Sequence, residues 1–216
     1  MIWKIILCLA LGYLFGCIQT GYFYGRMHGI DLREHGSGNV GTTNVMRVFG
    51  KKAGILIYAS DALKAIIPVL LVRFVIFPGM EETQLLSIYT GLGAVLGHDF
   101  PFYMKNFKGG KGIAATSGAM AAFDFRFIIP EALGFFIAFF TTCYVSVGSL
   151  VLATLFPILV LVFYPGQWHI FVISLIYCIL AYWQHRENIK RLRNGTENGF
   201  LRKSVKKKEK KDEKHE

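Results

Sequence analysis

The sequence contains no Cys-x-x-Cys pair. Its four cysteines, Cys8, Cys17, Cys143 and Cys178, all lie in apolar runs without polar neighbours suited to a metal, and cysteines in such surroundings behave as small core hydrophobes. An internal repeat of fixed period and a proline-rich linker are also absent. These absences argue against a metal site or a redox centre and favour a single domain that needs no cofactor.

Charge is scarce as well. Charged residues make up 18% of the 216 residues and hydrophobic residues 53%, and the mean hydropathy of +0.43 is too high for a soluble domain of this size. A bilayer core about 30 Å thick requires roughly 20 apolar residues per helix. We therefore predict an all-α, polytopic transmembrane bundle with seven spans. The predicted spans are Ile2–Tyr24, Gly54–Phe77, Leu85–Tyr103, Ile113–Phe123, Phe127–Tyr144, Leu150–Phe163 and Trp168–Trp183.

Two of these segments differ from ordinary membrane spans in position or length. Ile2–Tyr24 is long enough to span and only Lys4 precedes most of it, so we expect a membrane helix rather than a cleaved signal peptide. Ile113–Phe123 is short and begins in glycines. It is therefore expected to be a half-span or re-entrant helix, which is tolerated at membrane depth when packed in protein. Five or six spans in total remain alternatives.

The basic residues predict the orientation. They fill the first and third connections and the end of the chain, whereas the second, fourth and sixth connections hold one basic residue, Arg126. Because basic loops stay on the cytoplasmic side, we expect the N-terminus outside and the C-terminus in the cytoplasm, which five or seven crossings satisfy and six do not. The basic residues of the two inner connections are Arg26, Arg33, Arg47, Lys51, Lys52, Lys105, Lys108 and Lys111.

The end of the chain differs from the rest. Residues 196–216 are dominated by lysine and glutamate and have no apolar period. We predict a transmembrane domain over residues 1–195 followed by a disordered basic cytoplasmic tail. The tail is expected to attract anionic lipid weakly. Nucleic-acid binding is not expected, because aromatic residues do not alternate with the basic ones.

The first polar loop, from His35 to Arg47, is unusually rich in small polar residues. Its glycines allow successive backbone N–H groups to converge around an anion, and Arg47 adds a guanidinium suited to phosphate or carboxylate. A flexible hydrophilic connection is the plainer alternative. The residues concerned are Gly36, Ser37, Gly38, Asn39, Gly41, Thr43, Asn44 and Arg47.

A second anion site is predicted in the third connection. Lys108 and Lys111 flank Gly109 and Gly110, and a helix is expected to begin directly afterwards. Ammonium groups, backbone N–H groups and the positive end of a helix dipole therefore coincide there. Lys111 is followed by Gly112 rather than Ser or Thr, so the segment is not a Walker A loop and nucleotide hydrolysis has little support.

Further polar groups surround these loops. His185 and Asn188 share one face of a cationic helix that leaves the last span; alone, this would be an ordinary basic flank. Asp61 and Lys64 lie three residues apart inside the second span, where charges should pair or line a polar cavity. A structural ion pair is the favoured interpretation, and lining of the site is the alternative. His98, beside Asp99, is interpreted as a polar anchor rather than as a general base.

Three motifs together resemble the PlsY family of bacterial membrane glycerol-3-phosphate acyltransferases, which use acyl phosphate as donor. The order and spacing fit over nearly the whole chain up to the tail. The first motif is Ser37-Gly38-Asn39 through Thr43-Asn44-Val45 and Arg47 with Gly50-Lys51-Lys52. The second is Gly97-His98 with Phe100-Pro101 and Lys108-Gly109-Gly110-Lys111-Gly112. The third is His185-Arg186-Glu187-Asn188-Ile189-Lys190-Arg191 with Gly195-Thr196-Glu197.

The resemblance implies a seven-helix bundle in the bacterial inner membrane, with the three motifs on its cytoplasmic face. It implies that the 1-hydroxyl of sn-glycerol 3-phosphate attacks acyl phosphate, giving lysophosphatidic acid and phosphate. Five matching residues are expected to bind glycerol 3-phosphate: Ser37, Arg47, Lys111, His185 and Asn188. Thr43, Asn44 and the neighbouring glycines, including Gly38 and Gly41, match the acyl phosphate cradle, with Asn39 beside them; Lys108, Gly109 and Gly110 form the second anion loop.

The chain departs from the family in three places. Thr42 stands where alanine is usual, Asp99 stands where an apolar residue or cysteine is common, and the Lys/Glu tail is longer. No strong base is evident, so we expect the donor phosphate to deprotonate the hydroxyl, with His185 as the alternative base. A His-x4-Asp motif is absent, so an acyl-CoA or carrier-protein donor is not expected. A peripheral acyl phosphate synthase is an expected partner.

Two other classes of function remain open at this stage. Basic groups around a membrane cavity also serve in transporters of phosphate or glycerol 3-phosphate. However, the basic loops all fall on one side, and the outer connections are short and nearly uncharged. A lipid-binding scaffold is weaker still, because it would not require three polar loops on one face.

Overall fold

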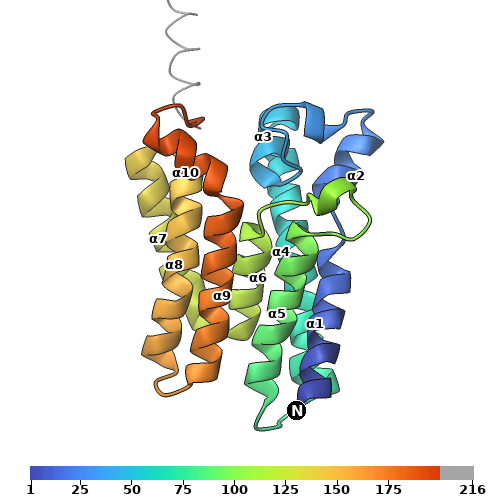
Figure 1. The fold of residues 1–216 in the computed structure, drawn as a ribbon, viewed down its shortest axis with the longest axis vertical. Coiled ribbons are helices and arrows are strands. Elements are labelled where there is room, and N and C mark those ends of the chain that lie inside the picture. Colours follow the sequence, from blue (N-terminus) through green and yellow to red (C-terminus); the bar gives the residue numbers. More distant parts are fainter. Residues whose placement is uncertain (200–216) are drawn as a thin grey trace, which may run out of the picture.

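The computed structural model describes residues 1–199, and every regular element in this part of the chain is a helix. Six long helices run side by side (Figure 1), which confirms the predicted all-α class. The long helices are α1 (Ile2–Gly16), α4 (Lys51–Leu71), α5 (Thr83–Asp99), α7 (Ile128–Thr142), α8 (Val145–Phe163) and α9 (Trp168–Gln184). The shorter ones are α2 (Thr20–Met27), α3 (Thr42–Phe49), α6 (Ile113–Phe123) and α10 (Arg186–Arg193), with single turns at Leu32–Glu34, Val72–Ile76, Lys105–Phe107 and Phe125–Phe127.

Each of the seven predicted apolar segments is largely helical, although the first is broken at residues 17–19 and the third leaves its helix after Asp99; the structure does not fix the number of spans at seven. In the described part of the chain, four helical stretches are long and apolar enough to cross a membrane: Ile2–Met27, Lys51–Ile76, Phe125–Thr142 and Val145–Phe163. A fifth is reached if α9 and α10, which meet at a bend of 57°, count as one span. Helix α6 has 11 residues, or about 16 Å at 1.5 Å per residue, so it is the half-length helix expected from the sequence.

Helices α1 and α5 approach each other unusually closely. A Cβ atom at Gly12 would lie 1.9 Å from the Thr90 carbonyl oxygen, and one at Gly93 would lie 2.2 Å from the Leu9 carbonyl oxygen. Gly16 and Gly97 meet the opposite backbone in the same way. Glycines four residues apart on both helices thus let the two backbones touch, as in small-xxx-small packing between membrane helices.

Gly93→Leu is expected to force α1 and α5 apart. The new side chain would collide with backbone that has no rotamer to yield, so we expect a loss of stability at or above the roughly 1–3 kcal/mol typical of overpacking. Thermal unfolding of the purified protein in detergent measures it. Ala59→Leu, at an exposed position on α4, is the matched control and should leave the unfolding temperature nearly unchanged. An equal shift in both variants would contradict close packing as the cause.

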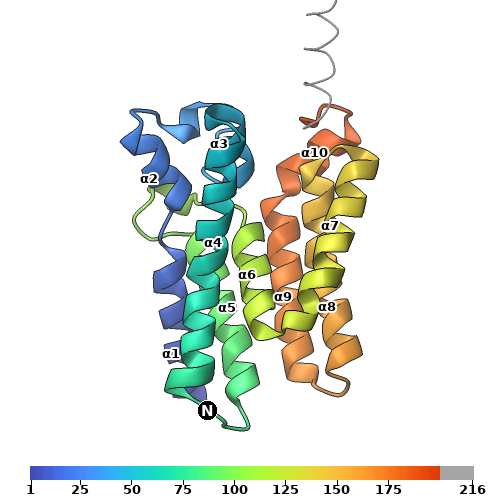
Figure 2. The same cartoon turned by 180° about the vertical axis from the view of Figure 1, so that it is seen from behind.

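The polar elements gather at one end of the bundle. The first predicted span is broken after Gly16, and α2 and α3 follow at the end of the molecule that also carries α10 (Figure 1). The N-terminus lies at the opposite end, which is also visible from behind (Figure 2). The short α6 packs between α4 and α5 on one side and α8 on the other. In the glycine loop that precedes it, Gly110 and Gly112 are buried, whereas Lys108 is exposed.

Candidate active site

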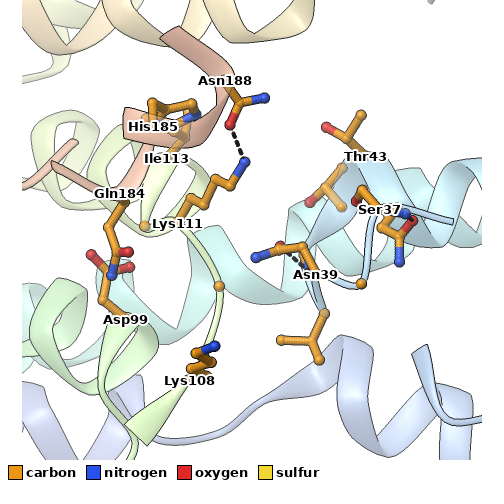
Figure 3. A pocket seen from close by; sticks show the side chains of 18 of the residues that line it. Ser37, Asn39, Thr43, Asp99, Lys108, Lys111, Ile113, Gln184, His185 and Asn188 are labelled. Atoms are coloured by element: carbon orange, nitrogen blue, oxygen red, sulfur yellow. Dashed lines mark hydrogen bonds between the residues drawn. The ribbon is translucent and has the colours of Figure 1, made fainter. Parts of the chain in front are cut away.

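The three polar segments predicted from the sequence meet in one cleft of about 990 Å³. The loop before α3, the loop between α5 and α6, and the start of α10 each contribute to its walls. Figure 3 shows two facing walls: Lys111, His185 and Asn188 on one, and Ser37, Asn39 and Thr43 on the other. The lining includes every residue predicted to bind substrate: Ser37, Gly38, Asn39, Gly41, Thr43, Asn44, Arg47, Lys108, Gly109, Gly110, Lys111, His185 and Asn188.

Asn44 holds the first loop in shape. Its side-chain oxygen accepts a hydrogen bond from the Ser37 N–H at 2.8 Å, and its amide nitrogen donates to the carbonyl oxygens of Leu32 and His35 at 3.2 and 2.9 Å. Gly36, at φ +64°, passes so close that a Cβ would lie 2.2 Å from the Asn44 side-chain oxygen. The amide predicted to contact substrate is therefore engaged within the loop, and its role here is to support that loop.

The N-terminus of α3 faces the cleft. Asn39 accepts a hydrogen bond from the Gly41 N–H at 2.9 Å, which fixes the chain just before the helix begins. Thr42 and Thr43 follow as its first residues, and the buried hydroxyl of Thr42 has no hydrogen-bond partner. An unpaired buried hydroxyl is costly unless something occupies the site. Thr42 thus lines the cleft with a hydroxyl that has no partner among the described residues.

The glycine loop is held by the end of α5. The N–H groups of Gly109 and Gly110 donate to the carbonyl oxygens of Asp99 and His98, each at 3.0 Å. Lys111 then extends into the cleft, where its ammonium donates to the Asn188 side-chain oxygen. Burial, with the nearby cations Arg191 and Arg47 as further causes, lowers the pKa of Lys111 to about 8. Such a site favours the entry of an anion, which restores the charged form of the lysine.

His185 joins α9 to α10. Its Nδ1 lies 2.8 Å from the Ala181 carbonyl oxygen, and because a carbonyl only accepts, Nδ1 carries the proton. The other nitrogen, Nε2, then has a lone pair that can accept a hydrogen bond. Burial and the charge of Lys111 lower the pKa of His185 to about 4, so the ring is neutral at pH 7.

Glu197, at the end of the third motif, is bonded to three side chains around the cleft. Its carboxylate accepts hydrogen bonds from Asn188 at 2.6 Å, Arg191 at 2.7 Å and Ser146 at 3.0 Å, so it fixes the predicted substrate residue Asn188. Arg47 in turn donates to the Asn198 carbonyl oxygen at 3.3 Å. The chain therefore stays in contact with the site through Asn198, beyond the predicted domain boundary at 195. The remainder of the predicted tail, 200–216, lies outside the described residues.

Asp61 and Lys64 form the expected buried ion pair, with Nζ and Oδ1 2.9 Å apart. Asp61 also lines the cleft, so the two interpretations hold together. Among the described residues, no hydrogen bond joins the side chains of His98 and Asp99; His98 Nδ1 lies 2.7 Å from Lys64 Nζ instead. Within residues 1–199, no group of three or more His, Cys, Asp or Glu side chains is placed to hold a metal ion.

The fold and the cleft define a helical membrane protein with a large cleft, lined by several basic side chains, at one end of the bundle. Residues 6–195 match the sequence family described as glycerol-3-phosphate acyltransferase. The chain is similar to glycerol-3-phosphate acyltransferases of Lactiplantibacillus plantarum, at 36% identity over 90% of this chain and 91% of that protein, and of Thermoanaerobacter sp., at 40% over 89% and 93%. The chain therefore belongs to the glycerol-3-phosphate acyltransferase family.

The fold agrees with this assignment. A crystal structure of PlsY, an integral membrane glycerol 3-phosphate acyltransferase, in its glycerol 3-phosphate form superposes with a TM-score of 0.82 and 34% identity, covering 93% of this chain and 98% of that one. The lysophosphatidic acid form of PlsY matches with a TM-score of 0.79 and 33% identity, covering 91% and 95%. The predicted resemblance to the PlsY family is confirmed.

Proposed function

We propose that this protein transfers a fatty acyl group from acyl phosphate to the 1-hydroxyl of sn-glycerol 3-phosphate, releasing lysophosphatidic acid and inorganic phosphate. The observation that carries the proposal is a single cleft with anion-binding groups on both walls. Lys111, His185 and Asn188 lie on one wall, and the loop with Ser37 and the N-terminus of α3 on the other (Figure 3). Two phosphorylated substrates can bind there together despite their mutual repulsion.

Positioning supplies much of the chemistry, because an acyl phosphate is already activated. The enzyme must hold the hydroxyl of glycerol 3-phosphate against the acyl carbonyl and stabilise the oxyanion that forms. The hydroxyl oxygen bonds to the carbonyl carbon, the bond to the phosphate oxygen breaks, and the proton leaves with phosphate. Lys111, Arg47 and backbone N–H groups provide positive charge for these steps.

The low pKa of His185 supports the donor phosphate, rather than His185, as the base. A group with a pKa of about 4 is a weak base at pH 7, whereas the departing phosphate gains basicity as its bond to the acyl carbon breaks, and phosphate has a second pKa of about 6 even in its monoesters. His185 then accepts a hydrogen bond from the glycerol moiety through Nε2 and orients it, and the donor phosphate takes the proton.

His185→Gln tests this assignment. Glutamine retains a hydrogen-bond acceptor but is not a base, so kcat is expected to stay within about tenfold of the native value, below the 10²–10⁴-fold contribution of a general base. Initial rates of phosphate release at saturating substrates measure kcat, and the KM for glycerol 3-phosphate is recorded alongside. Loss of turnover at unchanged KM would identify His185 as the base.

The topology is part of the proposal. We place the protein in the bacterial inner membrane with seven crossings, the N-terminus outside and the cleft facing the cytoplasm, where a peripheral acyl phosphate synthase would supply the labile donor. The distribution of lysine and arginine supports this orientation. The absence of His-x4-Asp supports acyl phosphate over acyl-CoA as donor.

One assay tests both the activity and the donor. Detergent-solubilised protein should release phosphate from palmitoyl phosphate only when glycerol 3-phosphate is present, and should form no lysophosphatidic acid from palmitoyl-CoA. Appreciable turnover with palmitoyl-CoA would overturn the donor assignment. Exchange of glycerol 3-phosphate across liposomes without any chemistry would instead indicate a transporter.

A further inference from the structure

A cluster of buried polar side chains lies beneath the glycine loop, and the proposed reaction gives it no task. It consists of Asp61 and Lys64 on α4 and His98 on α5, which are 2%, 4% and 4% exposed. A buried ion pair is weak evidence for stability, because desolvation offsets most of the attraction between the charges. Stability alone therefore does not account for the presence of these charged groups at this place.

Every hydrogen of the Lys64 ammonium has a partner. Nζ donates to the Ile18 carbonyl oxygen at 2.6 Å, lies 2.9 Å from Asp61 Oδ1, and lies 2.7 Å from His98 Nδ1. The Ile18 carbonyl belongs to the break between α1 and α2, so one lysine joins three segments of the chain. These are α4, α5 and the interrupted first span, which lie next to one another in Figure 2.

The contact with Lys64 fixes the tautomer of His98. An ammonium beside a carboxylate has hydrogens to donate and no lone pair, so His98 Nδ1 must accept and cannot carry a proton. The imidazole proton then resides on Nε2, on the far side of the ring. Which nitrogen of a histidine is protonated is commonly set by the partner of the other, and here the partner is a buried lysine.

The far side of the ring lies against the glycine loop. A Cβ at Gly110 would be 1.9 Å from His98 Nε2, and a Cβ at Gly109 would be 2.0 Å from the His98 carbonyl oxygen. That carbonyl also accepts the Gly110 N–H at 3.0 Å and the Gln19 side-chain amide at 2.9 Å. The His98 ring thus packs against the glycine loop through its Nε2 side, and Lys64 contacts the opposite, Nδ1 side of the ring.

We infer that Lys64 and His98 are positioning residues for the anion-binding loop Lys108–Gly112. Lys64 holds His98 in the Nε2–H tautomer. The imidazole ring in turn sets the path of the loop, and the path of the loop determines how Lys111 reaches Asn188. The inference rests on the proposed function, since the loop is taken to bind a substrate phosphate. It predicts that loosening the cluster weakens binding of glycerol 3-phosphate while the chemical step is largely kept.

The test removes both charges together, so that neither is left buried alone. In the double variant Asp61→Leu with Lys64→Met, we expect the KM for glycerol 3-phosphate to rise at least tenfold and kcat to stay within about threefold. Binding of glycerol 3-phosphate in the absence of donor, measured by calorimetry, should weaken by the same factor. His98→Asn is a second variant: its side-chain oxygen can still accept from Lys64, but the part of the ring under Gly110 is lost, so KM should rise here too.

Arg73→Met is the matched control. Arg73 lies in the turn that continues α4, does not line the cleft, and donates to the carbonyl oxygens of Ala122 and Phe123 at 2.7 and 2.6 Å. Its loss also removes a cation that bonds to backbone, yet should leave the KM unchanged. An unchanged KM in the double variant, a fall in kcat alone, or an equal rise of KM in Arg73→Met would overturn the inference.

The native protein provides a readout that needs no folded variant. ¹⁵N-labelled histidine spectra of the whole native protein should show one ring, assigned to His98 through its contact with the Lys64 ammonium, with Nε2 protonated and Nδ1 unprotonated. A proton on Nδ1 would overturn the inference even if the variants fail to fold. If the native protein binds glycerol 3-phosphate but makes no lysophosphatidic acid, the proposed function fails while the binding comparison still decides the role of Lys64 and His98.

Discussion

Lys111→Met is expected to lower kcat/KM for glycerol 3-phosphate by about 10²–10³-fold, in the range seen when one partner of a buried charged hydrogen bond is removed. Lys111 is half-buried and bonded to Asn188, so its loss removes positive charge from the wall that also carries His185. Phosphate release by purified protein in detergent measures the effect. Lys190→Met, an exposed lysine of α10 outside the cleft, is the control and should retain nearly full activity.

Titration of the Lys111 ammonium group is expected to make kcat/KM depend on pH. The pKa of Lys111 is lowered to about 8 by burial and by the neighbouring cations Arg191 and Arg47, so the charged form is complete well below pH 8 and is lost as the pH rises through 8. Because kcat/KM reports ionisations of the free enzyme, it should fall on the alkaline side with a midpoint near 8. Lys111→Arg, which stays charged, should move that limb upward. A loss of less than tenfold in Lys111→Met, or an alkaline limb unmoved in Lys111→Arg, would remove Lys111 from the anion site.

Local patterns predicted the parts of the site that are contiguous in sequence. Gly36, Gly38 and Gly41 indicated a curved backbone, and Lys108–Lys111 before a helix indicated an anion loop; both segments line the cleft. Such signals are readable because the conformation of a glycine loop, and the charge at a helix N-terminus, depend on a few adjacent residues. The short helix α6 was likewise evident from the length of its apolar run.

Contacts between segments that are distant in the sequence could not be predicted. Nothing near Glu197 in the sequence indicates that its carboxylate binds Ser146, 51 residues away, or that the Asn44 amide is used up within its own loop. The contacts of Glu197 and Asn198 could not be predicted for the same reason: the composition of 196–216 is that of a solvated segment, whereas these contacts depend on tertiary packing. Asp61 and Lys64 could be predicted as a pair from helical spacing, but their link to His98 and the glycine loop required the fold.

Gly110→Ala is expected to raise the KM for glycerol 3-phosphate strongly. The φ angle of Gly110 is not among the positive ones, so an alanine there is not strained by its backbone; the obstacle is steric, because its Cβ would lie 1.9 Å from His98 Nε2. Either the loop or the ring must move. Since the position of Lys111 follows that of the loop, we expect the KM for glycerol 3-phosphate to rise by about 10²-fold, the scale on which misplacement by about 1 Å affects catalysis, while the fold is kept.

A double-mutant cycle separates this clash from a general effect of the methyl group. His98→Ala removes the ring and leaves space for the new Cβ, although it also removes the support of the loop. If the collision with His98 is the cause, adding Gly110→Ala to His98→Ala should change the KM by no more than about threefold, so the two effects are strongly non-additive. Additive effects would mean that Gly110 is required because substrate approaches its Cα directly, which would place the bound phosphate against the loop backbone rather than at the Lys111 ammonium.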